Sequence, residues 1–131
     1  MSSNSARKTS IQTSHAPEAL GPYSQAIQAG PWLFLSGQIP LLPSGQLCPG
    51  GIREQTRQVL HNMQAVLEAA GGTLQEVTQT TCYLCSLDDF QAFNEVYAQH
   101  FAAPFPARAT VEVKALPKNA LVEISALAYL G

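Results

Sequence analysis

The chain has 131 residues, a length typical of one domain, and 46% of them are hydrophobic, enough for a substantial core. Only 12% are charged, against roughly 25% in an average globular protein. A small domain with so few charges is expected to bury part of its surface in an oligomer. The net charge of -2 and the lack of any run of lysine or arginine argue against a nucleic-acid partner.

The first part of the chain is polar. Residues 1–14 include Arg7 and Lys8 but no acid, and we expect them to form a flexible tail ahead of a single domain over residues 15–131. The longest apolar run near the N-terminus extends from Trp32 to Leu35, which is far too short to span a bilayer. We therefore expect no membrane partner.

The cysteines are Cys48, Cys82 and Cys85, an odd number without secretory features, which favours a reducing compartment and predicts a cytoplasmic protein. Cys82 and Cys85 have the spacing of a redox or zinc motif. Residues 77–84 read as a strand, however, and residues three apart on a strand face opposite sides of the sheet. Because no second pair completes a zinc site, we predict buried structural thiols and no bound metal.

Alternating apolar and polar residues predict two strands, Tyr23–Ala29 and Trp32–Ile39, joined by a turn at Gly30-Pro31. Gly37 within the second strand indicates a bulge or a close approach of another group to the backbone. Residues 40–51 are rich in proline and glycine, so a loop is expected there.

Two segments have the spacing of amphipathic helices. The first, Ile52–Ala70, is ended by Gly71-Gly72, and a strand over Val77–Leu84 follows. The second begins after Ser86, a favourable N-cap residue, and runs to about Phe101. Its apolar stripe, which we interpret as core, consists of Phe90, Phe93, Val96, Tyr97 and Phe101.

Two further strands, Ala107–Ala115 and Leu121–Tyr129, complete the order β-β-α-β-α-β-β. This order predicts an α+β fold, a two-layer sandwich with both helices on one face of the sheet. The strand–helix–strand segment over residues 77–115 predicts a right-handed parallel crossover. We expect a six-stranded, mostly antiparallel mixed sheet.

Arg108 stands near the start of one of these strands, close to the rigid backbone of Pro106. Its planar fork of donors matches the two oxygens of a carboxylate, which indicates binding of a small acid. The alternative is a surface arginine that pairs with Glu112 or Asp88. Position alone leaves both interpretations open.

Glu123 lies between Val122 and Ile124 in an otherwise apolar strand. Charged residues are rarely buried without a partner or a purpose. The carboxylate is therefore either a general base that orients water or one half of an ion pair, for example with Lys114. The sequence alone slightly favours the ion pair.

Other polar candidates carry a weaker signal. Tyr23, Ser36 and Gly37 lie on the predicted hairpin, where a hydroxyl can face a cleft. Asn94 lies on the second helix, where simple solvent exposure is the alternative. The sequence has no Ser-His-Asp order, no phosphate-binding loop and no HExxH motif, and its histidines are scattered without metal-ligand spacing.

Several ordered blocks of the sequence resemble the reactive intermediate deaminase family (RidA or YjgF), also described as the endoribonuclease L-PSP family. The resemblance runs from about residue 10 to the C-terminus. Because the blocks occur in family order, together they are far more specific than any one alone. They are Gly21-Pro22-Tyr23-Ser24-Gln25-Ala26, Ser36-Gly37-Gln38-Ile39-Pro40, Phe105-Pro106-Ala107-Arg108, Val111-Glu112-Val113 with Leu116-Pro117-Lys118, and Val122-Glu123-Ile124 with Ala126.

The resemblance implies a chorismate-mutase-like fold and a homotrimer with ligand clefts between neighbouring subunits. It implies that Arg108 clamps the substrate carboxylate and that Glu123 positions a water. The cleft would be lined by Tyr23, Ser36, Gly37 and Asn94. The position two after the arginine is often cysteine in the family and is Thr110 here, which keeps a small polar side chain but not a thiol.

The implied activity is hydrolysis of 2-enamines and 2-imines, such as 2-iminobutanoate and 2-iminopropanoate, to 2-oxo acids and ammonia. The resemblance implies no metal and no organic cofactor for this reaction. Two alternatives remain open. One is an endoribonuclease or translation inhibitor, against which the acidic net charge counts. The other is a trimer that binds small carboxylates without turning them over.

Overall fold

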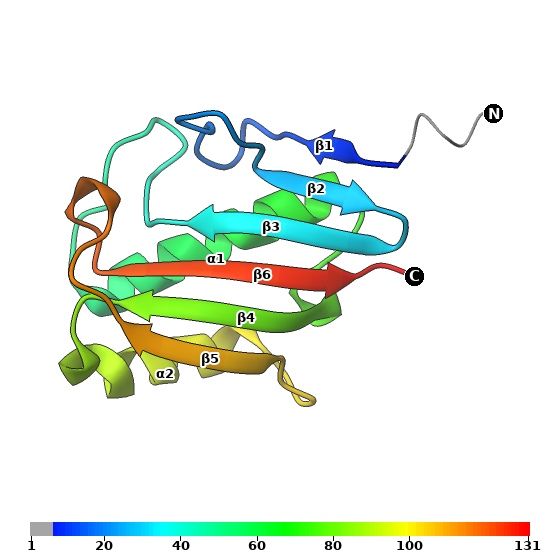
Figure 1. Cartoon of the computed structure of the whole chain (residues 1–131). Coiled ribbons are helices and arrows are strands. Elements are labelled where there is room, and N and C mark those ends of the chain that lie inside the picture. Colours follow the sequence, from blue (N-terminus) through cyan, green and yellow to red (C-terminus); the bar gives the residue numbers. More distant parts are fainter. Residues whose placement is uncertain (1–6) are drawn as a thin grey trace.

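A computed structural model describes residues 7–131. They form a six-stranded sheet of order β1-β2-β3-β6-β4-β5, in which neighbouring strands are antiparallel except for the parallel pair β4 and β5 (Figure 1). The helices are α1 (Ile52–Ala69) and α2 (Phe90–His100). The strands are β1 (Thr9–Ile11), β2 (Ala26–Ala29), β3 (Trp32–Gln38), β4 (Val77–Leu84), β5 (Ala107–Glu112) and β6 (Val122–Tyr129).

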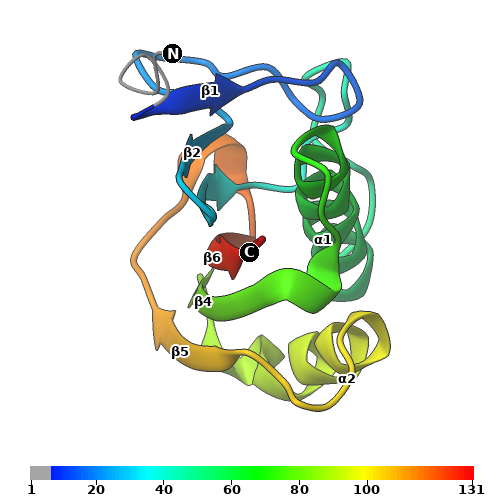
Figure 2. The same ribbon diagram turned by 90° about the vertical axis from the view of Figure 1, so that its right-hand side faces the viewer.

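Both helices pack on one side of the sheet, as Figure 2 shows. We call this side the helical face and the other side the open face. The core lies between the two layers and is built from fully buried apolar side chains. They include Val59, Leu60, Met63, Val66 and Leu67 of α1, Phe93 and Val96 of α2, and Val122, Ile124 and Ala128 of β6. The predicted α+β sandwich and its mixed sheet are confirmed, as is the parallel pairing of β4 with β5.

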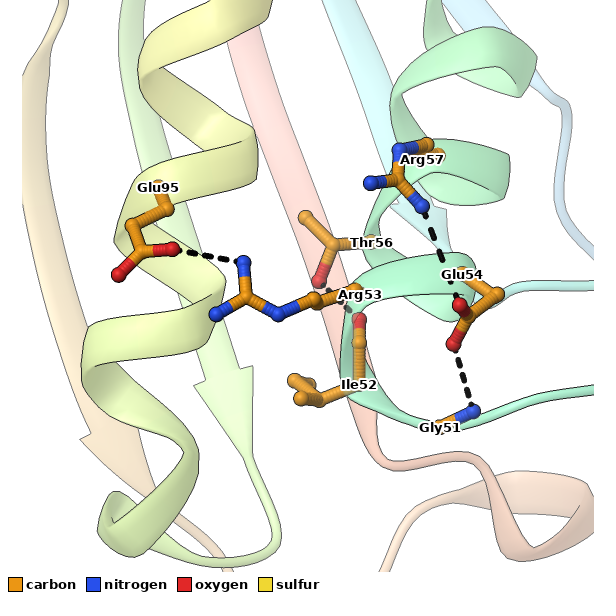
Figure 3. A network of polar contacts seen from close by, with 7 residues as sticks. All are labelled: Gly51, Ile52, Arg53, Glu54, Thr56, Arg57 and Glu95. Atoms are coloured by element: carbon orange, nitrogen blue, oxygen red, sulfur yellow. Dashed lines mark hydrogen bonds and ion pairs between the residues drawn. The ribbon is translucent and has the colours of Figure 1, made fainter.

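Polar contacts define the start of α1 and connect it to α2 (Figure 3). Glu54 accepts a hydrogen bond from the backbone N–H of Gly51 at 2.9 Å, which satisfies a donor that the first helical turn leaves free. Arg53 forms an ion pair with Glu95 of α2 at 2.7 Å. Both side chains of this ion pair are about half exposed, so it adds little to stability.

The open face of the sheet is unusual because it is largely apolar and uncharged. In β6, Val122, Ile124 and Ala128 face the helices, so the alternate residues from Glu123 to Tyr129 face the open side. Large apolar side chains remain exposed on the strands, among them Trp32, Phe34, Val111 and Tyr129. The rings of Trp32 and Tyr129 contact each other edge to face, with centroids 4.8 Å apart. A face of this kind is typical of surfaces that another protein covers.

The predicted flexible tail over residues 1–14 is wrong for Thr9–Ile11, which forms β1 and pairs antiparallel with β2. The rest of the tail prediction falls partly on residues 1–6, which lie outside the described residues. A three-residue edge strand carries almost no hydrophobic pattern of its own, because its stability comes from backbone pairing with its neighbour. The sixth strand of the sheet was therefore not assignable from the sequence.

Other boundaries differ by a few residues. The first predicted strand begins at Ala26 instead of Tyr23, and β5 ends at Glu112 instead of Ala115. The bulge that Gly37 indicated is present, because the register between β3 and β6 shifts between Leu35 and Gln38. The consequence is that Gly37 lies at a local irregularity of the sheet, where another group can approach its backbone.

The prediction of buried thiols is confirmed for Cys48 and Cys82, whereas Cys85 is only partly buried. The three cysteines are free, and burial raises the pKa of Cys82 to about 11. Cys85 lies beyond the end of β4, where its Sγ donates to the carbonyl oxygen of Ala120 at 3.2 Å. Among the described residues, neither helix is both long and apolar enough to cross a membrane.

Candidate functional site

Glu123 projects from β6 over the backbone of Gly37 in β3. A Cβ atom added to Gly37 would overlap the carboxylate of Glu123 and would lie 3.1 Å from its Cγ. No side chain other than hydrogen therefore fits at position 37 without moving the glutamate. The bulge in β3 and the glycine within it together create the space that the carboxylate occupies.

The electrostatic environment of Glu123 favours its neutral form. The side chain is half-buried, and burial raises its pKa above the ordinary carboxyl value. Among the described residues no cation forms an ion pair with it, so the alternative pairing with Lys114 is not formed. A carboxylate that is partly removed from water and has no counter-ion is well suited to accept a proton.

Ser36 and Tyr23 lie beside this glycine. Ser36 Oγ donates to the carbonyl oxygen of Ser24 at 2.6 Å, which fixes its orientation. The hydroxyl oxygen of Tyr23 accepts from the backbone N–H of Leu20 at 3.2 Å. Tyr23 and Gly37 line the same small cavity of about 30 Å³. We refer to Tyr23, Ser36, Gly37 and Glu123 as the Glu123 cluster.

Arg108 lies on β5 against the aromatic side of α2. Its Cζ is 4.8 Å from the ring centroid of Tyr97 and 5.6 Å from those of Phe90 and Phe93. Among the described residues no acid forms an ion pair with Arg108. Glu112, one of the acids suggested as its partner, instead accepts from the backbone N–H of Leu87 at 2.8 Å. The guanidinium is therefore held by rings and keeps its charge unneutralised.

Asn94 and Thr110 accompany Arg108. Asn94 and Arg108 line a cavity of about 300 Å³ together with Tyr97, Ala98, Phe105 and Pro106. The side-chain oxygens of Asn94 and Thr110 are both buried and have no hydrogen-bond partner within the described residues. Buried polar atoms without partners are rare in folded proteins, and here they stand next to an unpaired cation. We refer to Asn94, Arg108 and Thr110 as the Arg108 cluster.

The two clusters lie on opposite faces of the sheet. Arg108 pairs in register with Thr80, which is buried under the helices, so Arg108 is on the helical face. Glu123 pairs with Tyr83, the residue of β4 that faces the other way, so Glu123 is on the open face. One copy of the chain thus presents two separate sets of polar groups and does not bring Arg108 and Glu123 together.

Comparison with known proteins identifies the family. The protein-family model described as Endoribonuclease L-PSP matches residues 13–130 of this chain. A RutC family protein from Pyrococcus horikoshii is 53% identical over 123 residues, which cover 93% of this chain and 98% of that protein. The human 2-iminobutanoate/2-iminopropanoate deaminase is 47% identical over 122 residues, which cover 92% of this chain and 89% of that protein. The chain belongs to the RidA/YjgF family.

The fold of this RidA-family chain also matches solved structures. The crystal structure of E. coli TdcF with bound serine superposes with a TM-score of 0.88 at 37% identity, covering 94% of this chain and 99% of TdcF. The α+β architecture expected for the family thus matches that of a solved relative.

The aromatic contacts of Arg108 were missed by the sequence interpretation. Phe90, Phe93 and Tyr97 recur three and four residues apart, a spacing that predicts a core stripe of the second helix, and Phe93 and Tyr97 do lie in the core. In the RidA-family chain the same spacing places three rings on the side of α2 that faces Arg108. The signal that would have found them is the pairing of an aromatic stripe with an arginine on the following strand.

Proposed function

We propose that this chain is a hydrolytic deaminase that converts 2-imino and 2-enamino acids, such as 2-iminobutanoate and 2-iminopropanoate, to 2-oxo acids and ammonia. The observation that carries the proposal is the presence of two charged side chains that form no ion pair within residues 7–131. Arg108 keeps its donors available for an anion, and Glu123 is partly removed from water. Such a pair suits a small acid with a hydrolysable carbon–nitrogen double bond.

The complete site is formed, in this proposal, between neighbouring copies in a homotrimer. The Arg108 cluster of one copy would meet the Glu123 cluster of the next, because one chain holds them on opposite faces of its sheet. The nearly uncharged open face, with Phe34 and Tyr129 exposed, supports burial of this surface against further copies. The head-to-tail contact between identical chains in a three-fold ring would bring the same two clusters together at each interface.

The names of relatives support the substrate class. The human relative is named as a deaminase of 2-iminobutanoate and 2-iminopropanoate, and TdcF carries bound serine in its crystal structure. Each of these molecules is a small acid with nitrogen on the carbon next to the carboxylate. We infer that the same class of molecule is the substrate of this chain.

The proposed mechanism needs one water and one carboxylate that carries protons from oxygen to nitrogen. The substrate carboxylate binds the guanidinium of Arg108 through two parallel hydrogen bonds. Glu123 removes a proton from a water as its oxygen bonds to the imine carbon, and it returns that proton to the nitrogen as the carbon–nitrogen double bond becomes single. In the resulting carbinolamine, Glu123 takes the hydroxyl proton and passes it to the amine nitrogen, so that the carbon–nitrogen bond breaks, ammonia leaves and the carbonyl forms. Positioning and general base catalysis of about 10²–10⁴-fold suffice, since free imines already hydrolyse in water.

The deciding experiment supplies the imine as it forms. A pyridoxal-phosphate-dependent threonine dehydratase releases the enamine and imine of 2-oxobutanoate, and 2-oxobutanoate formation is followed with and without the purified protein. We expect release faster than spontaneous hydrolysis. An unchanged rate contradicts the proposal. Calorimetric binding of 2-oxobutanoate without turnover would then identify a carboxylate binder, and cleavage of a defined RNA that Arg108→Ala abolishes would identify a ribonuclease.

Subunit mixing tests the shared site. Arg108→Ala and Glu123→Gln proteins are each expected to be nearly inactive. In co-expressed mixed trimers, a site is intact when its arginine comes from a Glu123→Gln chain and its glutamate comes from an Arg108→Ala chain. Random assembly at equal amounts restores about one quarter of the wild-type activity. Mixed trimers with no activity above that of the separate variants would show that both residues must come from the same chain.

Gly37→Ala tests whether the glutamate needs the space above the backbone. The new methyl group would overlap the Glu123 carboxylate, so the carboxylate must move, and we expect turnover to fall about 10- to 100-fold. Circular dichroism should show an unchanged fold. Gly51→Ala is the matched control, because its methyl group would lie 3.9 Å from the nearest side-chain atom, Glu54 Oε1. Equal rates for the two variants would contradict the role of Gly37.

A further inference from the structure

The guanidinium of Arg108 contacts aromatic rings, whereas many ligand-binding arginines form an ion pair with an acid. Phe90, Phe93 and Tyr97, which we call the aromatic platform, surround its guanidinium, and the ring of Tyr97 is the nearest at 4.8 Å. Tyr97 is itself fixed. Its hydroxyl forms a buried hydrogen bond of 2.8 Å with Thr80 Oγ1. Its ring also packs against Phe101, with centroids 4.6 Å apart.

The same pair of strands fixes both partners. Thr80 of β4 is the direct partner of Arg108 in the parallel register of β4 and β5. Thr80 therefore binds the hydroxyl of Tyr97 from the strand position next to Arg108. A continuous chain of contacts thus links the backbone of Arg108 to its own guanidinium. It runs through the pairing with Thr80, the hydrogen bond from Thr80 to Tyr97, and the ring of Tyr97. An arginine placed in this way loses few rotamers when a ligand arrives.

We propose that the aromatic platform positions Arg108 for the substrate carboxylate, with Tyr97 as its central positioning residue. An acidic partner would occupy N–H donors of the guanidinium and neutralise its charge. A ring face attracts the cation through its quadrupole and leaves the donors in the guanidinium plane available. The platform thus gives a fixed arginine that is still fully charged. The identity of the ligand in this inference rests on the proposed function. The contacts between the aromatic platform and Arg108 do not depend on that function.

The kinetic test compares three variants of the full-length protein on imines supplied by threonine dehydratase. Tyr97→Leu removes the central ring and is expected to raise KM about tenfold, with kcat changed less than about threefold. Tyr97→Phe keeps the ring and should hold KM within about threefold of the wild type. Val96→Ala truncates a fully buried side chain of the same helix that is not part of the aromatic platform, and its KM should stay near the wild-type value.

Two outcomes of these kinetics would overturn the inference. One is an unchanged KM in Tyr97→Leu, and the other is an equal rise in Val96→Ala, which would assign the effect to core packing. Should Tyr97→Leu fail to fold, Phe90→Leu replaces it, because Phe90 is 38% exposed and its loss spares the core. We expect Phe90→Leu to raise KM about threefold, and an unchanged value would count against the platform.

A second measurement is independent of catalysis and so separates this inference from the proposed function. In ¹⁵N NMR spectra the Nε–H signal of Arg108, assigned by its loss in Arg108→Lys, should be shifted upfield by the ring currents of the platform. The shift should persist in Tyr97→Phe and shrink in Tyr97→Leu and in Phe90→Leu. If the protein proves inactive on imines but the signal behaves in this way, the support of Arg108 stands and the deaminase proposal fails. A signal at its ordinary position in the wild type overturns the platform.

Discussion

Replacing Arg108 by alanine is expected to reduce kcat/KM for the imino acid about 100- to 1000-fold. The change removes both hydrogen bonds to the substrate carboxylate, and charge-assisted bonds of this kind contribute roughly 1.5–3 kcal/mol each. Because the carboxylate is bound in the ground state and in the transition state alike, most of the loss should appear as a higher KM. Steady-state kinetics with the threonine dehydratase assay measure the effect.

The matched control for this change is Arg57→Ala. Arg57 lies on α1, where it makes a long ion pair of 4.0 Å with Glu54 and is about half exposed. Loss of this pair should leave the rate unchanged and the stability nearly so. An Arg108→Ala protein with undiminished turnover would contradict the mechanism, whereas Arg108→Lys should retain part of the activity, since it keeps the charge but not the fork of donors.

Replacing Glu123 by glutamine is expected to lower kcat about 10²- to 10⁴-fold while changing KM little. Glutamine has the same shape over Gly37 but cannot take a proton from water. Glu95→Gln is the control, because Glu95 is an exposed partner of Arg53 on the outer helical surface. Equal rates in wild type and Glu123→Gln would exclude the glutamate as the base.

The pH profile gives a second measure of Glu123. Burial raises the pKa of this carboxyl, so in acid the base form is lost at a pH above the ordinary carboxyl range. We expect kcat of the wild type to fall as the pH is lowered through that raised pKa, and to be independent of pH over the same range in Glu123→Gln. A rate that stays level for the wild type down to the ordinary carboxyl pKa would contradict the assignment.

Much of this arrangement follows from the sequence, for identifiable physical reasons. Alternation along the last strand predicts that Glu123 faces the side of the sheet opposite to Val122 and Ile124. The structure shows this arrangement, because both neighbours are buried and Glu123 is only partly buried. The same alternation places Arg108 and Thr110 on one face of their strand. The glycine in the apolar strand Trp32–Gln38 marked the close approach of another group, which is the carboxylate of Glu123.

Other features were beyond the reach of the sequence. β5 is an edge strand with exposed residues on both sides, so its pattern could not show that Arg108 faces the helices and Glu123 the opposite side. Pairing between strands decides this, and pairing depends on residues far apart in the chain. β1 was missed for the same reason. The buried oxygens of Asn94 and Thr110 also depend on how α2 packs over β5.

The placement of Arg108 and Glu123 on opposite faces of the same sheet has a consequence for how the rate depends on protein concentration. A chain with a self-contained site has the same turnover per molecule at any dilution. In the proposed shared site, a separated copy carries both Arg108 and Glu123 but cannot bring them together, so dilution below the concentration at which copies associate should lower the specific activity, with a rate that rises more steeply than linearly with protein. The dependence of the reaction rate on protein concentration would then measure how tightly the copies associate.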